Sequence, residues 1–372
     1  MVEARTRPAW ATVDLDAIRH NVSCLVELVA PAAVCASVKA DAYGHGAVPV
    51  AEAILEAGAH WLAVSQVDEG VELREAGIDA PILLLSEPPL AAVDAAVARH
   101  LTLTVYSDAG VDAVETAAVM HGRQSVSVHL KVDTGMHRAG ASVEDAPALA
   151  RRIAESRHLH LEGLMTHFAV ADEPDREADT KAQLERFETV RDGLAAEGIV
   201  PDVLHTANSA GAIAFEAARY DMVRCGIAVY GYAPAPIDVR PALSLTAEVA
   251  FVREVEAGEG VSYGLRYTCP ERTRIAVVPL GYADGVPRRL SAVGGEVLVG
   301  GRRRPIAGTV TMDMLMVDCG PDADVAVGDE VVLLGSQGDE AVWADEWARL
   351  LDTISYEIVC GIGPRVPRRY VG

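Results

Sequence analysis

The sequence predicts an α/β protein in which an N-terminal (β/α)8 barrel is followed by a mostly β C-terminal domain. Between residues 30 and 230, eight short apolar runs alternate with amphipathic helical stretches. After about Pro241 the pattern changes to short β-branched or alternating runs separated by glycine turns. Eight strands that alternate with helices are typical of a closed barrel, and a doubly wound open sheet is the competing architecture.

The predicted strands of the barrel are short and end at polar or glycine-containing segments. In the clearest predicted helix, Leu184, Phe187, Val190 and Leu194 share one face. Asp179 is expected to cap the start of this helix and Gly198 its end. The eight strands are expected at residues 34–38, 61–64, 82–85, 101–105, 126–132, 161–165, 203–205 and 222–224.

The last third of the chain is predicted to be rich in β-strands. Strands are expected at residues 245–255, 275–280, 297–299, 314–317 and 331–334, and one helix at 341–351. No low-complexity linker separates this part from the barrel. With 372 residues the chain is long enough for two cores, so we expect a barrel domain at 1–240 and a β-rich domain at 241–372.

The composition limits the classes of partner. The formal net charge is −22, from 54 acidic and 32 basic residues, so the surface repels nucleic acid phosphates and anionic membranes. No apolar run approaches the roughly 18 residues of a membrane span, and the N-terminus does not resemble a secretory signal. The six cysteines form no CxxC pair and no metal-ligand spacing. We therefore expect a soluble cytoplasmic protein with buried thiols, without a metal, nucleic acid or membrane partner.

Lys39 is the residue whose context most clearly suggests covalent chemistry. It ends the apolar run 34–38, and a glycine-bracketed loop up to Gly46 follows at once. A desolvated lysine loses its proton more readily and can form a Schiff base with a carbonyl group. A surface lysine at a strand end is the plainer interpretation, and the motifs further along the chain decide between the two.

Polar residues recur where the predicted strands end, which is the end at which barrels carry their catalytic groups. Phosphate sites in barrels often lie after the seventh and eighth strands, where backbone N–H groups at a helix start bind the anion. Ser209 is predicted to open a helix, and Gly226 allows a close approach of the backbone. The residues at the strand ends are Lys39, Lys131, Asp133, Arg138, His167, Asn208, Ser209, Arg224, Gly226 and Ile227.

These motifs resemble those of bacterial alanine racemases, which are pyridoxal phosphate (PLP) enzymes with an N-terminal barrel and a C-terminal β domain. The most diagnostic segments are VKADAYGHG at 38–46 and VSYG at 261–264. The other matching segments are 131–138, 166–168, 207–209, 224–227, 281–285, 311–313 and 354–357. Because they occur in order from residue 38 to 357, the resemblance covers nearly the whole chain.

The resemblance implies a two-base reaction. Lys39 would hold PLP covalently and, once substrate displaces it, act as the base on one face of the substrate Cα. Tyr263, donated by the partner subunit of a homodimer, would be the acid/base on the opposite face. Removal of a proton on one face and its return on the other inverts the centre in either direction.

The resemblance also assigns the groups around the cofactor. Arg224 would donate to the pyridine nitrogen, which leaves the ring neutral because arginine cannot accept its proton. His167 would bridge Arg224 and Tyr263. Arg138 would bind the substrate carboxylate. Lys131, which is often carbamylated in the family, would position Arg138 because the modified side chain is an anion.

The remaining implied residues bind phosphate or shape the pocket. Met312 and Asp313 of the partner would contact the substrate, and Tyr282 would line the entrance. The cofactor-binding set is Lys39, Tyr43, His167, Asn208, Ser209, Arg224, Gly226, Ile227 and Tyr356, of which Tyr43, Ser209, Gly226, Ile227 and Tyr356 would bind the phosphate.

The implied reaction is the interconversion of L-alanine and D-alanine, which supplies D-alanine for cell-wall peptidoglycan precursors. A PLP-dependent decarboxylase of a basic amino acid would place a glutamate where this chain has Arg224, and it would lack the Tyr263 motif. A PLP-carrier protein would resemble the barrel alone. A broad-specificity racemase remains open, since one extra methylene is discriminated by only about 1–3 kcal/mol.

Overall fold

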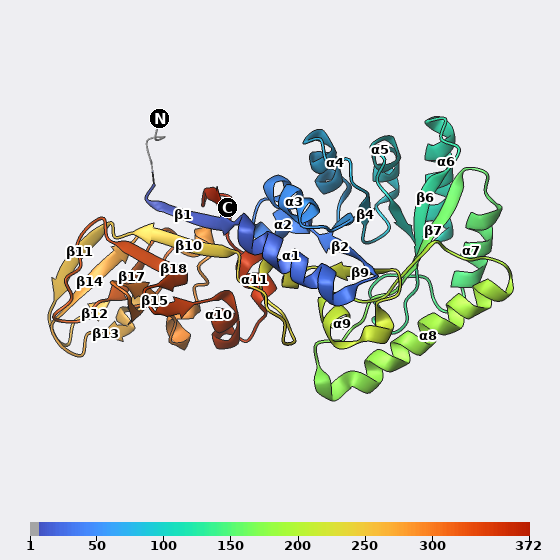
Figure 1. Cartoon of the computed structure of the whole chain (residues 1–372). Coiled ribbons are helices and arrows are strands. Elements are labelled where there is room, and N and C mark those ends of the chain that lie inside the picture. Colours follow the sequence, from blue (N-terminus) through green and yellow to red (C-terminus); the bar gives the residue numbers. More distant parts are fainter. Residues whose placement is uncertain (1–6) are drawn as a thin grey trace. The chain divides into compact units, whose positions relative to one another are not determined.

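A computed structural model describes residues 7–372, and these divide into two compact units (Figure 1). The barrel unit comprises Ala17–Ala42 and Ala47–Arg240. The β unit comprises Pro241–Gly372, Tyr43–Gly46 and the described residues up to Asp16. Among the described residues, no helix is long and apolar enough to cross a membrane.

The barrel unit contains eight parallel strands in a closed order, as the sequence predicts. One sheet has the order β4-β3-β2-β9 and the other β5-β6-β7-β8. A parallel bridge between Leu83 and Thr102 joins β4 to β5, and Asp221 N donates to Leu204 O (3.1 Å) between β9 and β8. This closure excludes an open doubly wound sheet. The strands are β2 (Ala33–Ser37), β3 (Trp61–Val64), β4 (Ile82–Leu84), β5 (Leu103–Val105), β6 (Val126–Lys131), β7 (Leu159–Met165), β8 (Val203–His205) and β9 (Met222–Cys225).

One helix of this unit precedes the first barrel strand and the others follow strands, while buried apolar side chains fill the barrel between the strands. Cys35, Ala63, Leu83, Met165 and Met222 form one buried cluster contributed by five strands. Such layers of inward side chains make the barrel a packed core. The helices are α1 (Leu15–Val29), α2 (Lys39–Gly44), α3 (Ala47–Glu56), α4 (Val67–Glu75), α5 (Val93–Ala98), α6 (Asp108–Met120), α7 (Ala146–Glu155), α8 (Glu177–Ala196) and α9 (Ser209–Ala214), with 3-10 turns η1 (Leu90–Ala92), η2 (Pro174–Arg176), η3 (Glu216–Ala218) and η4 (Ile227–Tyr230).

Helix α8 confirms the predicted apolar face but not the predicted cap. Phe187, Val190 and Leu194 are buried, Leu184 is half-buried, and Gly198 follows the helix end with a φ of +80°. The helix begins at Glu177, so Asp179 lies inside its first turn and pairs with Arg176 Nε at 2.8 Å. The cap prediction was wrong because the preceding 3-10 turn continues directly into the helix.

In the part of the β unit that the structure describes, there are one large sheet and two small ones. The large sheet has the order β16-β15-β18-β10-β1-β20, with β19 added to β18, and the small sheets are β11-β14-β17 and β12-β13. Its strands are β1 (Ala9–Asp14), β10 (Leu243–Glu248), β11 (Phe251–Val255), β12 (Gly260–Val261), β13 (Tyr267–Thr268), β14 (Thr273–Val278), β15 (Glu296–Val299), β16 (Arg302–Pro305), β17 (Leu315–Asp318), β18 (Glu330–Gln337), β19 (Glu340–Val342) and β20 (Arg368–Val371). Its helices are α10 (Ala344–Leu351) and α11 (Ser355–Cys360), with 3-10 turns η5 (Tyr263–Leu265), η6 (Tyr282–Asp284) and η7 (Leu290–Val293).

Strand β1 lies in the β unit, although the sequence analysis assigned residues 1–240 to the barrel domain. It pairs antiparallel with β10 and parallel with β20, so its backbone groups are satisfied by strands more than 200 residues away. The predicted strand 245–255 is two strands, because the chain turns between β10 and β11 at residues 249–250. The predicted helix at 341–351 begins later, at Ala344, since Glu340–Val342 pairs with β18.

Candidate active site

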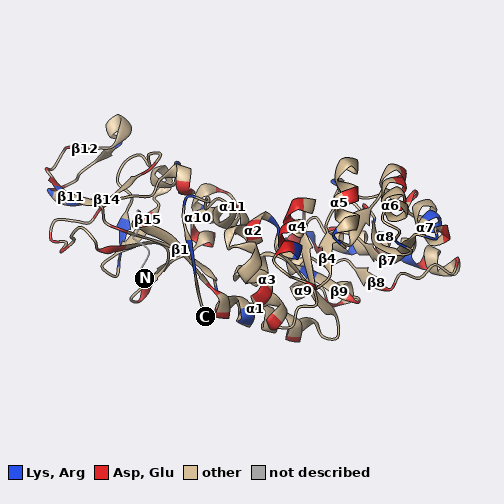
Figure 2. Ribbon diagram, turned by 90° about the horizontal axis from the view of Figure 1, so that it is seen from above, with Lys and Arg blue, Asp and Glu red and all other residues tan. Residues whose placement is uncertain are grey.

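The barrel unit carries its predicted functional residues at the carboxyl ends of the strands. Lys39 follows β2, Lys131 ends β6, His167 follows β7, and Arg224 lies near the end of β9. Parallel strands bring these ends to one rim of the barrel. Acidic residues are spread over outer helices such as α4, α5 and α6 (Figure 2). The barrel therefore has a cationic rim on a strongly acidic protein.

Lys39 is followed by a left-handed helical turn. Residues Ala40 to Tyr43 have φ values of 51° to 53°, and Gly44 has +79°. Ala42 N donates to Val38 O at 2.8 Å, so the turn is hydrogen-bonded. Left-handed helix costs roughly 1–2 kcal/mol per L-residue. Four consecutive non-glycine residues in this conformation show that the segment after Lys39 is strained and held in place by its surroundings.

Arg224 is buried and donates to the ends of two neighbouring strands. Its Nη1 donates to His205 O (2.9 Å) and His205 Nδ1 (3.0 Å). Its Nη2 donates to Thr166 O (2.6 Å), Thr206 O (3.0 Å) and His167 Nδ1 (3.3 Å). Burial lowers the pKa of Arg224 to about 10, so the side chain remains a cation at neutral pH. Only its Nε–H lacks a hydrogen-bond partner within residues 7–372.

The contacts of Arg224 fix the tautomers of two buried histidines. Because a guanidinium only donates, His205 Nδ1 accepts, and the proton of His205 sits on Nε2. That N–H donates to His129 Nδ1 at 2.8 Å, and His129 Nε2 then donates to Glu162 Oε2 at 3.2 Å. Burial holds the pKa of both histidines below the usual range, markedly so for His205. Two neutral histidines therefore link the guanidinium of Arg224 to the carboxylate of Glu162.

The surroundings of Lys131 and His167 favour the uncharged form of each side chain. Burial, followed by the positive charges of Arg224, Arg138 and Lys39, lowers the pKa of Lys131 to about 7. Burial and the same cations hold the pKa of His167 well below its usual range. Lys131 Nζ donates to Leu85 O at 2.9 Å. A large fraction of Lys131 is therefore a neutral amine at pH 7.

Arg138 lies in the exposed loop after β6. Within residues 7–372 it makes no hydrogen bond or ion pair, and the structure does not bring it into contact with Lys131. Its charge still acts on Lys131, because it is one of the cations that lower the pKa of that amine. Arg138 thus repels the protonated form of an unmodified Lys131.

Ser209 and Gly226 meet across the loops after β8 and β9. Ser209 Oγ accepts from Gly226 N at 2.9 Å. Asn208 is the N-cap of α9, and its side chain accepts from Gly211 N at 2.9 Å. Ile227 begins η4 directly after Gly226. The two loops predicted to form a phosphate cradle are therefore joined by a hydrogen bond.

In the β unit, Tyr263 is presented outward on a braced loop. Its side chain is 74% exposed. Thr309 Oγ1 donates to Tyr263 O (2.9 Å), and Ser262 Oγ donates to Thr309 O (2.7 Å). Positive φ values at Ser262 (65°), Gly264 (77°) and Leu265 (48°) turn the chain sharply on both sides of Tyr263. The backbone is fixed while the phenol points to solvent in this single chain.

The structure brings the motifs at 281–285 and 311–313 together. Tyr282 N donates to Thr311 O (2.9 Å) and Ala283 N to Met312 O (3.0 Å). A Cβ on Gly281 would lie 2.3 Å from Thr311 O, so this close approach requires glycine.

The two remaining pairs of the β unit have different surroundings. Asp313 accepts from Arg365 Nη2 at 2.7 Å, so its carboxylate is already paired. Tyr43 and Tyr356 lie with ring centroids 5.8 Å apart, the first buried and the second exposed. The two tyrosines predicted to bind phosphate are therefore neighbours.

Comparison with known proteins decides the family. The model of the alanine racemase N-terminal domain matches residues 13–234, and that of the C-terminal domain matches residues 242–370. An alanine racemase of Symbiobacterium thermophilum is 48% identical over 371 residues, which cover 98% of both chains. The chain belongs to the alanine racemase family.

Solved structures of alanine racemases have the same fold. The enzyme from the D-cycloserine producer Streptomyces lavendulae aligns with a TM-score of 0.92 and 40% identity, over 100% of this chain and 98% of that one. The Bacillus anthracis alanine racemase, described with bound L-Ala-P, aligns with a TM-score of 0.91 and 39% identity, over 99% of this chain and 96% of that one. Fold class and family therefore agree with the sequence analysis.

The residues around Arg224 and Ser209 fit the cofactor of an alanine racemase. Arg224 offers one unpartnered donor, Nε–H, in a setting where both neighbouring histidines are neutral. A ring nitrogen without a proton accepts from such a group, whereas a protonated one does not. Ser209 and Gly226 stand at the position where barrels commonly bind phosphate. The donor set thus suits a neutral pyridine with a phosphate arm.

Sequence reasoning missed the residues behind this site, which are the buried His129 and His205 and the half-buried Glu162. One signal was available for His129, because it lies two residues before Lys131 on β6 and so faces the same side of the strand. Within the described residues, no group of three or more His, Cys, Asp or Glu side chains is placed to hold a metal.

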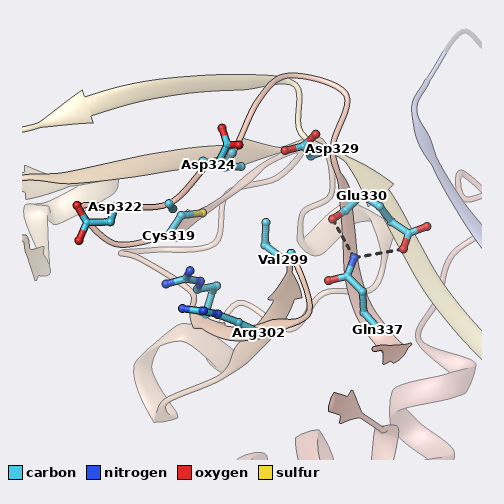
Figure 3. A pocket seen from close by; sticks show the side chains of 12 residues that line it. Val299, Arg302, Cys319, Asp322, Asp324, Asp329, Glu330 and Gln337 are labelled. Carbon is cyan, nitrogen blue, oxygen red and sulfur yellow. Dashed lines mark hydrogen bonds between the residues drawn. The ribbon is translucent and has the colours of Figure 1, made fainter. Parts of the chain in front are cut away.

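The β unit also contains a pocket that is lined by none of the predicted site residues. Asp322, Asp324, Asp329 and Glu330 line it together with Arg302, and Gln337 Nε2 donates to Glu330 (Figure 3). These carboxylates are exposed, and exposed acidic residues most often form a solvated face. None of the predicted site residues lies there.

Proposed function

We propose that this protein interconverts L-alanine and D-alanine with PLP bound covalently through Lys39, and that it supplies D-alanine for peptidoglycan precursors. The observation that carries the proposal is the arrangement around Arg224. An arginine with a free Nε–H and neutral histidine neighbours is suited to a neutral pyridine ring. A decarboxylase of a basic amino acid would need a carboxylate at this position.

Lys39 and Tyr263 are the two bases of the proposed reaction. PLP, when bound, withdraws electron density from the substrate Cα and so makes its proton removable. Lys39 Nζ would take or return the proton on one face of Cα, and Tyr263 Oη would do so on the other. His167, held neutral, would link Arg224 to Tyr263. Two groups on opposite faces allow inversion in both directions.

The exposure of Tyr263 supports a homodimer with shared active sites. Leu265 is 65% exposed, and Met314, which lines the same pocket as Tyr263 and Leu265, is 47% exposed. Exposed apolar residues gathered in this way are typical of an interface. We therefore propose that the β domain, residues 241–372, contributes Tyr263, Met312 and Asp313 to the partner's site, whereas the barrel domain, assigned to 1–240, binds PLP.

The other predicted residues divide into a substrate group and a phosphate group. Arg138 would bind the substrate carboxylate, with Met312 and Asp313 at the same end and Tyr282 at the entrance. The proposed phosphate ligands are Tyr43, Ser209, Gly226, Ile227 and Tyr356, and Asn208 caps the helix that begins at Ser209.

Lys131 is proposed to carry a carbamate. Its neutral amine would attack CO2, forming an N–C bond and releasing one proton to solvent, so that the side chain becomes an anion. The pKa of about 7 supports this step, because only the unprotonated amine reacts. The carbamate would attract Arg138, which the free lysine repels.

The protein is proposed to act in the cytoplasm, because six free cysteines are compatible with a reducing compartment.

Serine and other small amino acids are proposed as minor substrates, since a pocket discriminates one added group only modestly.

The test is the formation of D-alanine from L-alanine by the purified protein with PLP, followed by chiral chromatography. D-alanine from the wild type, and little from Lys39→Ala or Tyr263→Phe, is the expected result. A PLP-loaded protein that forms no D-alanine would overturn the assignment of alanine as substrate.

A further inference from the structure

Glu69, on the first turn of α4, makes a contact that the reaction described above does not use. Its Oε2 accepts from Ser65 N (2.8 Å) and Gln66 N (3.0 Å), which caps its own helix. Its Oε1 accepts from Ala40 N at 2.6 Å, and this donor is the residue next to Lys39. One carboxylate therefore joins the loop after β3 to the loop after β2.

The contact falls where the backbone changes handedness. Ser37 is paired with Ala63, and Val38 N donates to Ala63 O (2.9 Å), so the β-ladder continues as far as Val38. From Ala40 to Gly44 φ is positive. The N–H of Ala40 thus lies between a strand and a left-handed turn, where neither element supplies its acceptor. Glu69 supplies that acceptor.

We propose that Glu69 is a positioning residue for Lys39: its carboxylate holds the Ala40 N–H and thereby fixes the backbone on which the PLP-bearing lysine stands. The inference rests on the proposed function for Lys39. Without the carboxylate, the left-handed turn loses a charge-assisted hydrogen bond at its first residue. The strained segment then relaxes, and the amine of Lys39 is no longer held in one place.

The experiment compares Glu69→Ala and Glu69→Gln with the control Asp68→Asn in the full-length protein. Asp68 is exposed and lies in the same first turn of α4, so the control loses the same charge at the helix start without a contact to Ala40. The side-chain amide in Glu69→Gln would retain one carbonyl oxygen, which can serve either Ala40 or the helix cap but not both. Three quantities are measured: amide exchange at residues 40–43 before and after PLP addition, the rate of PLP attachment to Lys39, and kcat and KM for alanine.

The expected result is faster exchange at residues 40–43 and slower PLP attachment in Glu69→Ala, with a fall in kcat of about 10–100-fold and KM within about twofold. Glu69→Gln should fall between this variant and the wild type, and Asp68→Asn should match the wild type. Should Glu69→Ala fail to fold, Glu69→Gln carries the test.

Faster exchange confined to Ser65 and Gln66, with unchanged exchange at residues 40–43 and unchanged PLP attachment, would show that Glu69 only caps α4 and would overturn the proposal. This outcome is distinct from failure of the proposed function. A wild type that does not racemise alanine refutes that function, whereas amide exchange in the PLP-free protein still tests the Glu69–Ala40 contact.

Discussion

Arg224 Nη1 and His205 Nδ1 lie 3.0 Å apart, and because the guanidinium can only donate, this contact fixes the tautomer of His205. His205 Nε2 then donates to His129, and His129 Nε2 donates to Glu162. The polar group that faces the proposed cofactor is thus held by a chain of side chains across the barrel, and each of them is satisfied by the next.

The ring of His129 depends on the absence of a side chain at Gly163. A Cβ there would lie 2.5 Å from His129 Cγ and Nδ1, whereas a Cβ on Gly193 would meet nothing within 4 Å. We expect Gly163→Ala to lower the free energy of unfolding by about 1–3 kcal/mol, and Gly193→Ala to raise it by about 0.5–1 kcal/mol. Urea unfolding measures both. Equal effects of the two substitutions would contradict the packing described for His129.

Ser209→Ala removes the acceptor of the Gly226 N–H. We expect PLP affinity to fall about tenfold and stability by about 1–3 kcal/mol, because a buried donor loses its partner. The matched control is Thr206→Val, at a residue just before Ser209 in the chain. This change removes a buried hydroxyl that donates to Ala218 O (2.7 Å). The control should lose stability with PLP affinity within about twofold of the wild type. Titration of the PLP-free protein with PLP measures this affinity. An equal loss of PLP affinity in both variants would argue against the phosphate cradle.

The lowered pKa of Lys131 predicts a pH dependence of the free energy of unfolding in CO2-free buffer. Its pKa is about 7 in the folded protein and about 10.4 in an unfolded chain, so between these values the unfolded state binds one more proton. Its contribution therefore makes stability fall as the pH is lowered from about 10 to 7, with a slope of about 1.4 kcal/mol per pH unit. Lys131→Met should lose this slope in urea unfolding at several pH values. The same slope in both proteins would mean that Lys131 is not desolvated.

A shared active site predicts complementation between two inactive variants. Lys39→Ala lacks one base and Tyr263→Phe the other, so a mixed dimer in which one chain supplies Lys39 and the other Tyr263 has one intact site. Mixing the two should restore racemisation as subunits exchange. No recovery, with exchange verified by differently tagged chains, would show that both bases come from one chain.

The barrel strands and their polar ends could be predicted because parallel strands buried on both faces are continuous apolar runs that stop at the rim. The family resemblance then supplied the roles of Lys39, Arg224 and Tyr263, which no local pattern distinguishes from ordinary polar residues. The pairing of β1 with β10 could not be predicted, since nothing local marks which distant strand satisfies its edge.

The left-handed turn after Lys39 could not be predicted from the sequence either. The residues Ala40 to Tyr43 include no glycine, and alanine favours a right-handed helix, so the local preference is overridden by tertiary contacts. A glutamate at the third position of a helix suggests a cap for that helix. It gives no indication that Glu69 also binds the backbone beside Lys39.

The most direct test of the two-base reaction is racemisation of L-alanine in D2O, stopped at low conversion and analysed by mass spectrometry of the separated enantiomers. If Lys39 and Tyr263 act on opposite faces, the newly formed D-alanine carries deuterium at Cα while the remaining L-alanine keeps its hydrogen. D-alanine that retains the hydrogen of the substrate would mean that one group moves the proton between the faces, and would contradict the assignment of two bases.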